Sequence, residues 1–210
     1  MKDILLIGGM ATGKTTLAKA IQTTAPNANY IYMAELAVGL PMTLQATVMP
    51  NILSKTRGEY IATMRDYNET PCRIFPRAQA DAFGQQVMDT YGATIFAEIG
   101  YDARKPNKVN ILDNIPKVAN VQHLKDRGVL VVGLRCSFDQ QVKRRTEQRK
   151  PNDPIASDDI ARQIRSTSQY FELPDILQLA DVVFDTTNVM SNSNGIVEAV
   201  LAAMKYWQIP

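Results

Sequence analysis

The sequence predicts an α/β fold of three layers, in which a parallel sheet of about five strands carries helices on both faces. Two observations lead to this prediction. Five short apolar runs occur along the chain, and stretches with helical spacing or helix-capping residues separate them. Strands that alternate with helices form parallel sheets, because a right-handed crossover returns the chain over the sheet. The length of 210 residues suits a single domain of this kind.

The N-terminal part of the chain contains the first two predicted strands. The apolar run Asp3–Ile7 predicts a buried strand, and a glycine-rich stretch separates it from a helix over Lys14–Thr24. A second strand is expected at Tyr30–Met33. Residues 34–108 contain no clear strand pattern, so we expect several short helices inserted before the third strand. This insert would form a wall of the ligand crevice at the carboxyl ends of the strands.

The remaining elements follow the insert. Pro116 suits the first turn of a helix, and Gly128 suits the position just beyond its end. Ser157 suits the N-cap of another helix, and a last helix is expected over Ile196–Trp207. The three strands expected in this half of the chain are Val109–Leu112, Val129–Leu134 and Val182–Phe184.

The glycine-rich stretch carries the most specific motif of the sequence. It matches the phosphate-binding pattern G-x-x-x-x-G-K-[ST], and it follows a strand and opens a helix, as this pattern requires. Glycines allow backbone N–H groups to turn toward phosphate oxygens. Lys14 would reach the β- and γ-phosphates, and the Thr15 hydroxyl would ligate Mg²⁺. We therefore predict a P-loop fold that uses ATP and Mg²⁺, with ATP bound by Gly8, Gly9, Met10, Ala11, Thr12, Gly13, Lys14, Thr15 and Thr16.

An acidic residue at the end of a neighbouring strand usually accompanies a P-loop. Asp113 follows the apolar run Val109–Leu112 and is the candidate here. It would be a metal-site and catalytic residue that holds a Mg²⁺-bound water or orients the reacting phosphate. The alternative is an aspartate that only caps a turn, since Asn110 interrupts the apolar run.

Other parts of the chain distinguish among the classes of P-loop protein. A GTPase needs an N/T-K-x-D segment that binds guanine, and the nearest match, Asn107–Asn110, lacks the aspartate and precedes the third strand. A motor ATPase usually needs further domains that 210 residues do not supply. A kinase needs an acceptor pocket and a closing lid, and this chain has candidates for both.

The insert supplies the acceptor-pocket candidates. A phosphorylated acceptor requires guanidinium groups that offset charge repulsion, whereas an acceptor hydroxyl requires a carboxylate base. Glu35, just past the second strand, is the candidate base. The number of arginines favours a (deoxy)nucleoside monophosphate as acceptor; a metabolite hydroxyl, and an ATP-binding protein without efficient transfer, are the alternatives. The arginines of the insert are Arg57, Arg65, Arg73, Arg77 and Arg104.

A cationic segment, Lys143–Lys150, is the lid candidate, and Arg162 and Arg165 follow it. A lid over residues 143–166 would offset the charge that develops on the transferred phosphoryl group. It would also exclude water. A solvated helix face is the alternative interpretation of these charges.

Taken together, these segments resemble the nucleoside monophosphate kinase family, and especially its deoxynucleotide kinase and dephospho-CoA kinase relatives. The resemblance spans most of the chain and rests on the P-loop, Asp113–Ile115, Ser137–Arg144, Ala180–Val183 with Asn188, and Gln85–Gly92.

This resemblance implies roles for several residues. Arg73 and Arg77 would bind the acceptor phosphate, Arg144 and Arg149 would be lid arginines with a catalytic role, and Asn188 would lie near the adenine ring. The chain also departs from the family. Relatives often have Asp-Gly-x-Arg where this chain has Asp-Asn-Ile-Pro from residue 113 onward, so one arginine of the pattern is missing.

The composition is consistent with an enzyme that acts on small molecules. A net charge of +2 favours neither nucleic acid nor a membrane surface as partner. The two cysteines, Cys72 and Cys136, form neither a disulfide framework nor a zinc site by their spacing. The apolar run Ile4–Ile7 is too short for a signal peptide or a membrane span. We expect a cytoplasmic monomer or homodimer whose partners are small-molecule nucleotide substrates.

Overall fold

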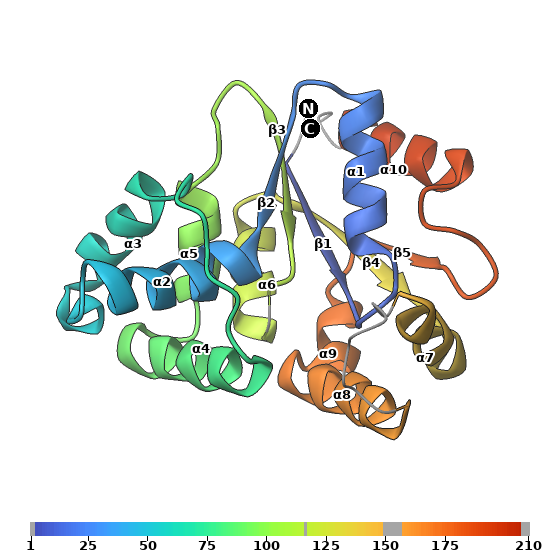
Figure 1. The fold of residues 1–210 in the computed structure, drawn as a ribbon. Coiled ribbons are helices and arrows are strands. Elements are labelled where there is room, and N and C mark those ends of the chain that lie inside the picture. Colours follow the sequence, from blue (N-terminus) through green and yellow to red (C-terminus); the bar gives the residue numbers. More distant parts are fainter. Residues whose placement is uncertain (1–2, 116, 149–156, 207–210) are drawn as a thin grey trace.

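The computed structural model describes residues 3–115, 117–148 and 157–206, and it confirms the predicted α/β class (Figure 1). One sheet of five strands has the order β2-β3-β1-β4-β5. All of its neighbouring strands are parallel. The second strand begins earlier than expected, at Ala28, and it ends at Tyr32 because Met33 already lies in a helical turn. The strands are β1 (Ile4–Gly8), β2 (Ala28–Tyr32), β3 (Val109–Asp113), β4 (Leu130–Arg135) and β5 (Val182–Asp185).

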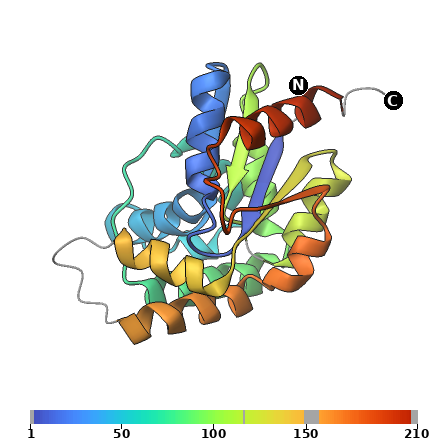
Figure 2. The same ribbon diagram turned by 90° about the vertical axis from the view of Figure 1, so that its right-hand side faces the viewer.

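The central strand, β1, separates two hydrophobic cores. Its side chains alternate between the faces of the sheet, and all of its residues are buried. Ile4 and Leu6 pack in the core formed with α1 (Lys14–Thr24) and α10 (Asn194–Tyr206). These two helices lie side by side on this face (Figure 2). A strand that is buried on both faces reads as a continuous apolar run, which is why the sequence identified it.

The predicted insert is helical, and none of residues 34–108 lies in a strand. Its helices form a group beside β2 (Figure 1) and contribute most of the second core. The first element is a π-helix that continues directly into an α-helix, so β2 leads straight into the insert. The elements are η1 (Glu35–Gly39), α2 (Leu40–Thr47), η2 (Ile52–Ser54), α3 (Arg57–Asp66), α4 (Arg77–Tyr91) and α5 (Ile95–Asp102).

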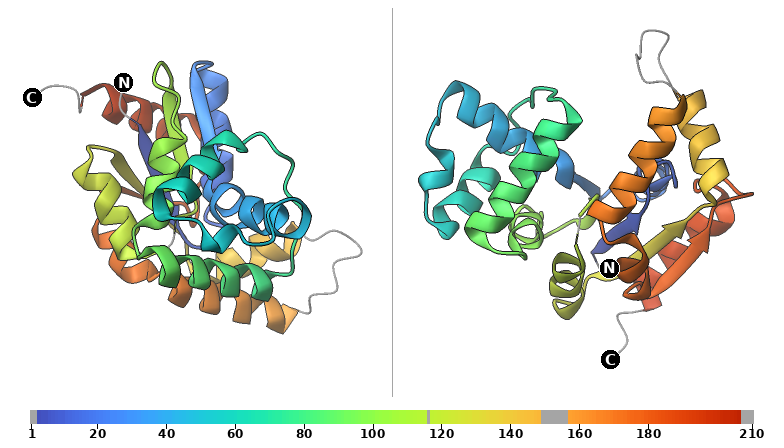
Figure 3. Two further views of the ribbon diagram at one scale, coloured as in Figure 1. Left: turned by 90° about the vertical axis from the view of Figure 1, so that its left-hand side faces the viewer. Right: turned by 90° about the horizontal axis from the view of Figure 1, so that it is seen from below.

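Helices α7, α8 and α9 lie across the molecule from most of the insert (Figure 3), whereas α6 packs against α5 of the insert. Helix α9 contacts β1, and α7 contacts α8. Part of the predicted lid, the predicted first-turn proline Pro116 and the end of the predicted last helix lie outside the described residues. No described helix is long and apolar enough to cross a membrane. These helices are α6 (Val118–Asp126), α7 (Phe138–Glu147), α8 (Ser157–Tyr170) and α9 (Leu173–Gln178).

Asn110, the polar residue that interrupts the apolar run of β3, has a structural role. It is 2% exposed. Its Nδ2 donates to Asp3 Oδ1 at 2.9 Å, and its Oδ1 accepts from Asn29 Nδ2 and from the backbone N–H of Lys105, both at 2.9 Å. The side chain therefore ties β3 to β2 and to the end of the insert, which offsets the cost of burying a polar group.

Candidate functional site

The glycine-rich loop leaves the carboxyl end of β1 and turns sharply into α1. Gly8 has φ 149° and Gly13 has φ 98°. A Cβ atom on Gly8 would lie 2.3 Å from the carbonyl oxygen of Leu134, and one on Gly13 would lie 2.2 Å from Ser191 Oγ. Both contacts are far shorter than real Cβ atoms make, and the φ values also disfavour a side chain. The loop therefore requires glycine at these two positions.

Hydroxyl groups fix the shape of this loop by binding its carbonyl oxygens. Thr12 Oγ1 donates to the Gly9 oxygen at 3.0 Å, and Thr186 Oγ1 donates to the Thr12 oxygen at 2.9 Å. Ser191 Oγ donates to the Gly13 oxygen at 2.9 Å. These bonds use none of the loop's N–H groups, which are the groups that bind phosphate in such a cradle. Sequence reasoning missed Thr186 and Ser191, because nothing local marks their distant partners.

Lys14 begins α1, and its Nζ donates to the carbonyl oxygens of Gly8 at 3.0 Å and Gly9 at 2.9 Å. Burial lowers the pKa of Lys14, while the negative charge of Asp113 opposes that shift. Burial raises the pKa of Asp113 in the same way, and Lys14 opposes it. Each group is thus pushed toward its neutral form, and their mutual attraction works against both shifts.

Asp113 ends β3 and is completely buried. Its Oδ2 accepts from Thr15 Oγ1 at 3.3 Å and from the Tyr30 hydroxyl at 2.8 Å. Its other carboxylate oxygen, Oδ1, is buried without a hydrogen-bond partner among the described residues. The structure therefore brings the two residues that the sequence assigned to the metal site into direct contact, and it adds Tyr30, which the sequence did not single out.

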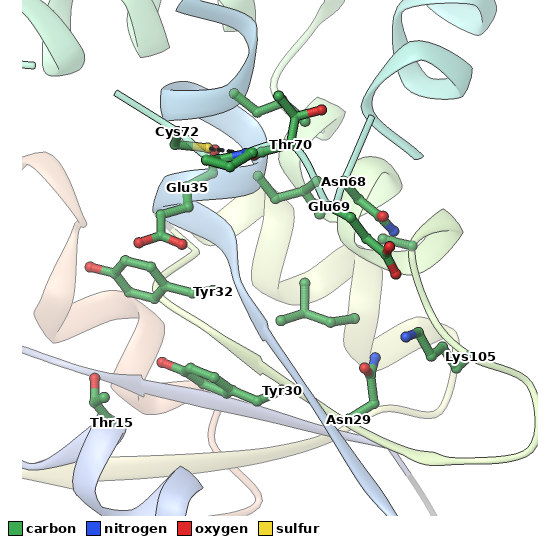
Figure 4. Close-up of a pocket in the computed structure, with 15 residues that line it drawn as sticks. Thr15, Asn29, Tyr30, Tyr32, Glu35, Asn68, Glu69, Thr70, Cys72 and Lys105 are labelled. Atoms are coloured by element: carbon green, nitrogen blue, oxygen red, sulfur yellow. Dashed lines mark hydrogen bonds between the residues drawn. The ribbon is translucent and has the colours of Figure 1, made fainter. Parts of the chain in front are cut away.

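A pocket of about 720 Å³ opens beside β2. It extends from Thr15 of the P-loop to the beginning of the insert and to the loop that follows α3 (Figure 4). Polar and apolar side chains share its surface. The lining residues are Thr15, Asn29, Tyr30, Ile31, Tyr32, Glu35, Leu36, Leu40, Asn68, Glu69, Thr70, Pro71, Cys72, Ala103 and Lys105.

Glu35 lines this pocket from the first turn of η1, and its side chain is exposed. Figure 4 shows its carboxylate and the hydroxyl groups of Tyr32 and Tyr30 pointing to the side on which Thr15 lies. A π-helical turn is rare and often occurs at functional sites, because it changes the direction in which side chains point. Here it directly follows the end of β2, where the sequence placed a candidate base.

Arg144 of α7 connects the P-loop with the loop that follows β5. Its guanidinium group donates to the carbonyl oxygens of Ala11 at 3.5 Å and Val189 at 3.5 Å, and it binds the carbonyl oxygen of Thr186. Asn188 lies in the same loop and is exposed. Arg149, the other predicted lid arginine, lies outside the described residues.

Most arginines of the insert already have acidic partners or lie away from the pocket. Arg73 is exposed, and its backbone N–H donates to Thr43 Oγ1 at 3.0 Å. Arg77 is the first residue of α4, and its side chain is outside the described part. Arg73 does not line the 720 Å³ pocket. The other three arginines form the ion pairs Arg57–Glu98 at 2.6 Å, Arg65–Asp102 at 3.3 Å and Arg104–Asp3 at 2.8 Å.

A family model described as chloramphenicol phosphotransferase-like protein matches residues 2–190. This range covers most of the chain and includes every site residue named above except Ser191. The chain belongs to the chloramphenicol phosphotransferase-like family. It is a P-loop phosphotransferase, and the predicted enzyme class is confirmed. No curated protein sequence matches the chain.

Two solved structures resemble the chain over nearly all of its length. The shikimate kinase of Acinetobacter baumannii, in complex with shikimate, has a TM-score of 0.54 at 16% identity, covering 100% of this chain and 96% of that one. The shikimate kinase of Bacteroides thetaiotaomicron has a TM-score of 0.49 at 18% identity, covering 98% and 97%. The first likeness confirms the P-loop kinase fold predicted from the resemblance to nucleoside monophosphate kinases.

The residues of the site fit the ATP and Mg²⁺ that P-loop kinases use. Phosphate groups bind where backbone N–H groups can turn toward them, and the loop allows this turn because Gly8 and Gly13 carry no Cβ atom. Mg²⁺ in such sites is held by one or two protein oxygens together with the phosphates. Thr15 donates its proton to Asp113, which leaves its lone pairs for a metal, and Asp113 Oδ1 has no other partner among the described residues.

Proposed function

We propose that this phosphotransferase transfers the γ-phosphoryl group of ATP to a hydroxyl group of a small molecule. One observation carries the proposal: a single pocket is lined both by Thr15 of the P-loop and by the carboxylate of Glu35. An acceptor bound in this pocket would lie next to ATP on the P-loop at one end and next to the candidate base, Glu35, in the same pocket. An attacking hydroxyl needs such a base, whereas a phosphate acceptor brings an ionised nucleophile.

The proposed step needs few groups. The oxygen of the acceptor hydroxyl forms a bond to the γ-phosphorus as the bond between that phosphorus and the leaving oxygen of ADP breaks. The hydroxyl proton passes to the carboxylate of Glu35. Lys14, together with the N–H groups of the loop, offsets the negative charge on the phosphoryl oxygens. Thr15 and Asp113 would hold the Mg²⁺ that accompanies ATP, and this ion would supply further charge neutralisation.

The charges of the pocket support a hydroxyl acceptor over a phosphorylated one. Among the described side chains, the lining of the pocket contains the carboxylates of Glu35 and Glu69, the cation Lys105 and no arginine. This surface would repel a phosphate dianion. The family description also names a phosphotransferase of chloramphenicol rather than of a nucleotide. A nucleoside monophosphate bound through Arg73 and Arg77 is the competing proposal.

The proposal also assigns roles to two segments. The insert, residues 34–108, would form the acceptor pocket, and residues 143–166 would close over the nucleotide. In this arrangement Arg144 and Arg149 would come from the closing segment, and Asn188 would lie beside the adenine ring. The contacts of Arg144 with Ala11 and Val189 support a position between the P-loop and the loop after β5.

The test is an ADP-release screen with the wild-type chain and the Glu35→Gln variant. The screen includes hydroxylated metabolites, amino alcohols and nucleoside monophosphates. With the correct hydroxyl acceptor, we expect Glu35→Gln to lower kcat by about 10²- to 10⁴-fold and to leave the KM for ATP unchanged. Glu198→Gln, at an exposed position on α10, is the matched control and should behave as the wild type.

Two results would count against the proposal. Stimulation of ADP release by nucleoside monophosphates alone would favour the phosphorylated acceptor. An unchanged kcat of Glu35→Gln with a hydroxyl acceptor would remove Glu35 as the base.

A further inference from the structure

The hydrogen bonds of Asp113 are distributed unevenly over its two carboxylate oxygens. Oδ2 accepts from both Tyr30 and Thr15, at 2.8 Å and 3.3 Å. Oδ1 is equally buried and has no hydrogen-bond partner among the described residues. A buried polar oxygen without a partner costs free energy and calls for an explanation. Because this oxygen lies beside the P-loop, a ligand of the nucleotide site would provide the missing partner.

The register of the sheet explains why Tyr30 reaches Asp113. Strands β2 and β3 are parallel, and Tyr30 lies opposite Ile111. Asp113 is two residues beyond Ile111, so its side chain points to the same face of the sheet. This is the face of α1, against whose core Tyr30 packs. A tyrosine is long enough to span the diagonal between neighbouring strands, and its hydroxyl therefore meets the carboxylate at the strand end.

We propose that Tyr30 is a positioning residue for the Mg²⁺ that accompanies ATP. With the Tyr30 and Thr15 hydroxyl groups both bound to Oδ2, the Asp113 carboxylate is held in one orientation. Oδ1 is then the oxygen available to the metal or to a water bound to it. The inference rests on ATP with Mg²⁺ as the phosphoryl donor and does not depend on which acceptor the enzyme uses.

The relative lengths of the two bonds indicate that Tyr30 contributes more than Thr15. The bond from Thr15 Oγ1 is 3.3 Å long and weak, whereas the bond from the Tyr30 hydroxyl is 2.8 Å, close to the preferred O–H···O distance. Without the tyrosine hydroxyl, Oδ2 would keep only the longer bond from Thr15. The buried carboxylate would then be held less firmly in this orientation, and its Oδ1 would be available to the metal for a smaller fraction of the time.

The variant Tyr30→Phe removes this hydroxyl and keeps the ring, which stacks on Tyr32 with ring centroids 6.3 Å apart. Calorimetric titration of the full chain compares ATP binding in excess Mg²⁺ with ATP binding in EDTA. We expect the affinity in Mg²⁺ to fall by about tenfold, the size expected for one lost hydrogen bond to a charged group. The affinity in EDTA should not change.

Two further variants make the result specific. Tyr67→Phe is the matched control, because this tyrosine is 39% exposed and lies outside the site; it should bind ATP as the wild type does in both buffers. Asp113→Asn should lose the Mg²⁺-dependent part of the affinity. If Tyr30 acts through Asp113, adding Tyr30→Phe to Asp113→Asn should cause no further loss.

Three outcomes would overturn the inference. They are no loss of affinity in Tyr30→Phe, an equal loss in Mg²⁺ and in EDTA, and additive losses in the double variant. An equal loss would indicate general damage to the nucleotide site. If Asp113→Asn does not fold, the comparison of the two buffers for Tyr30→Phe still decides the question. These titrations contain no acceptor, so they separate this inference from the hydroxyl-kinase proposal.

Discussion

Lys14 shows how the fold offsets the free-energy cost of burying a charged residue in this site. Its ammonium group is buried, which lowers its pKa, and the fold offsets the burial with two carbonyl oxygens of the loop and the nearby charge of Asp113. A lysine that only stabilised the fold would have a lower desolvation cost at an exposed position. The arrangement therefore indicates a charge kept for a ligand rather than for stability.

We predict that Lys14→Ala abolishes transfer and preserves the fold. Removing one preorganised cation from the transferred phosphoryl group should lower kcat by at least about 10²- to 10³-fold. The measurement is the ADP-release assay with the acceptor found in the screen, with circular dichroism as the check on folding. Lys205→Ala, an exposed lysine of α10, is the control. Near-normal turnover by the folded Lys14 variant would refute the assignment of this loop as the donor site.

At the scale of single elements, Arg57 and Arg65 hold α3 against α5 within the insert. Arg57 at the start of α3 donates from Nε and Nη2 to the two oxygens of Glu98 on α5. Thr94 Oγ1 donates to the same carboxylate at 3.0 Å. From the sequence alone, Arg57 was one member of a set that favoured a phosphorylated acceptor. Its actual partner is 41 residues away, so no local pattern could identify it.

This pairing predicts how the stability of the insert depends on pH. Burial would raise the pKa of Glu98, but the hydrogen bonds from Arg57 and Thr94 outweigh it and hold the pKa below its usual value. Since the pKa is lower in the folded chain, the pair stabilises the fold above the unfolded value of about 4.3. That contribution is lost as the pH falls from about 5 through the folded pKa.

The measurement is the free energy of unfolding in urea at pH 7 and at pH 4 for the wild type and Glu98→Gln. The variant should be less stable than the wild type at pH 7, and the difference should shrink at pH 4. Glu198→Gln should show no such change. A difference that stays constant between the two pH values would contradict the role of this ion pair.

At the scale of the whole molecule, the features that could be predicted from the sequence are those that local residue patterns determine. Strands buried on both faces, such as β1 and β3, read as apolar runs, and the P-loop has a fixed spacing. Asp113 and Glu35 could be proposed as site residues because each lies at or just past the end of a predicted strand, where a parallel sheet gathers its ligands. Tyr30 and Thr186 were not found, since their roles depend on the register of neighbouring strands and on contacts across the fold.

The P-loop is held by contacts with β4, α7 and the loop after β5, so nucleotide binding should stabilise the whole chain. A ligand that binds only the folded state at 100 times its Kd adds about 2.7 kcal/mol to the free energy of unfolding. For a chain of this size, each kcal/mol raises Tm by about 2–4 °C, so ATP with Mg²⁺ should raise it by about 5–10 °C. Differential scanning fluorimetry measures this shift in Tm.

Two comparisons test where the nucleotide binds. The Lys14→Ala variant should lose most of the Tm shift, and GTP should give a smaller shift than ATP, because the chain lacks a guanine-binding segment. An absent shift at saturating ATP, or an equal one in Lys14→Ala, would show that the nucleotide does not bind through this loop.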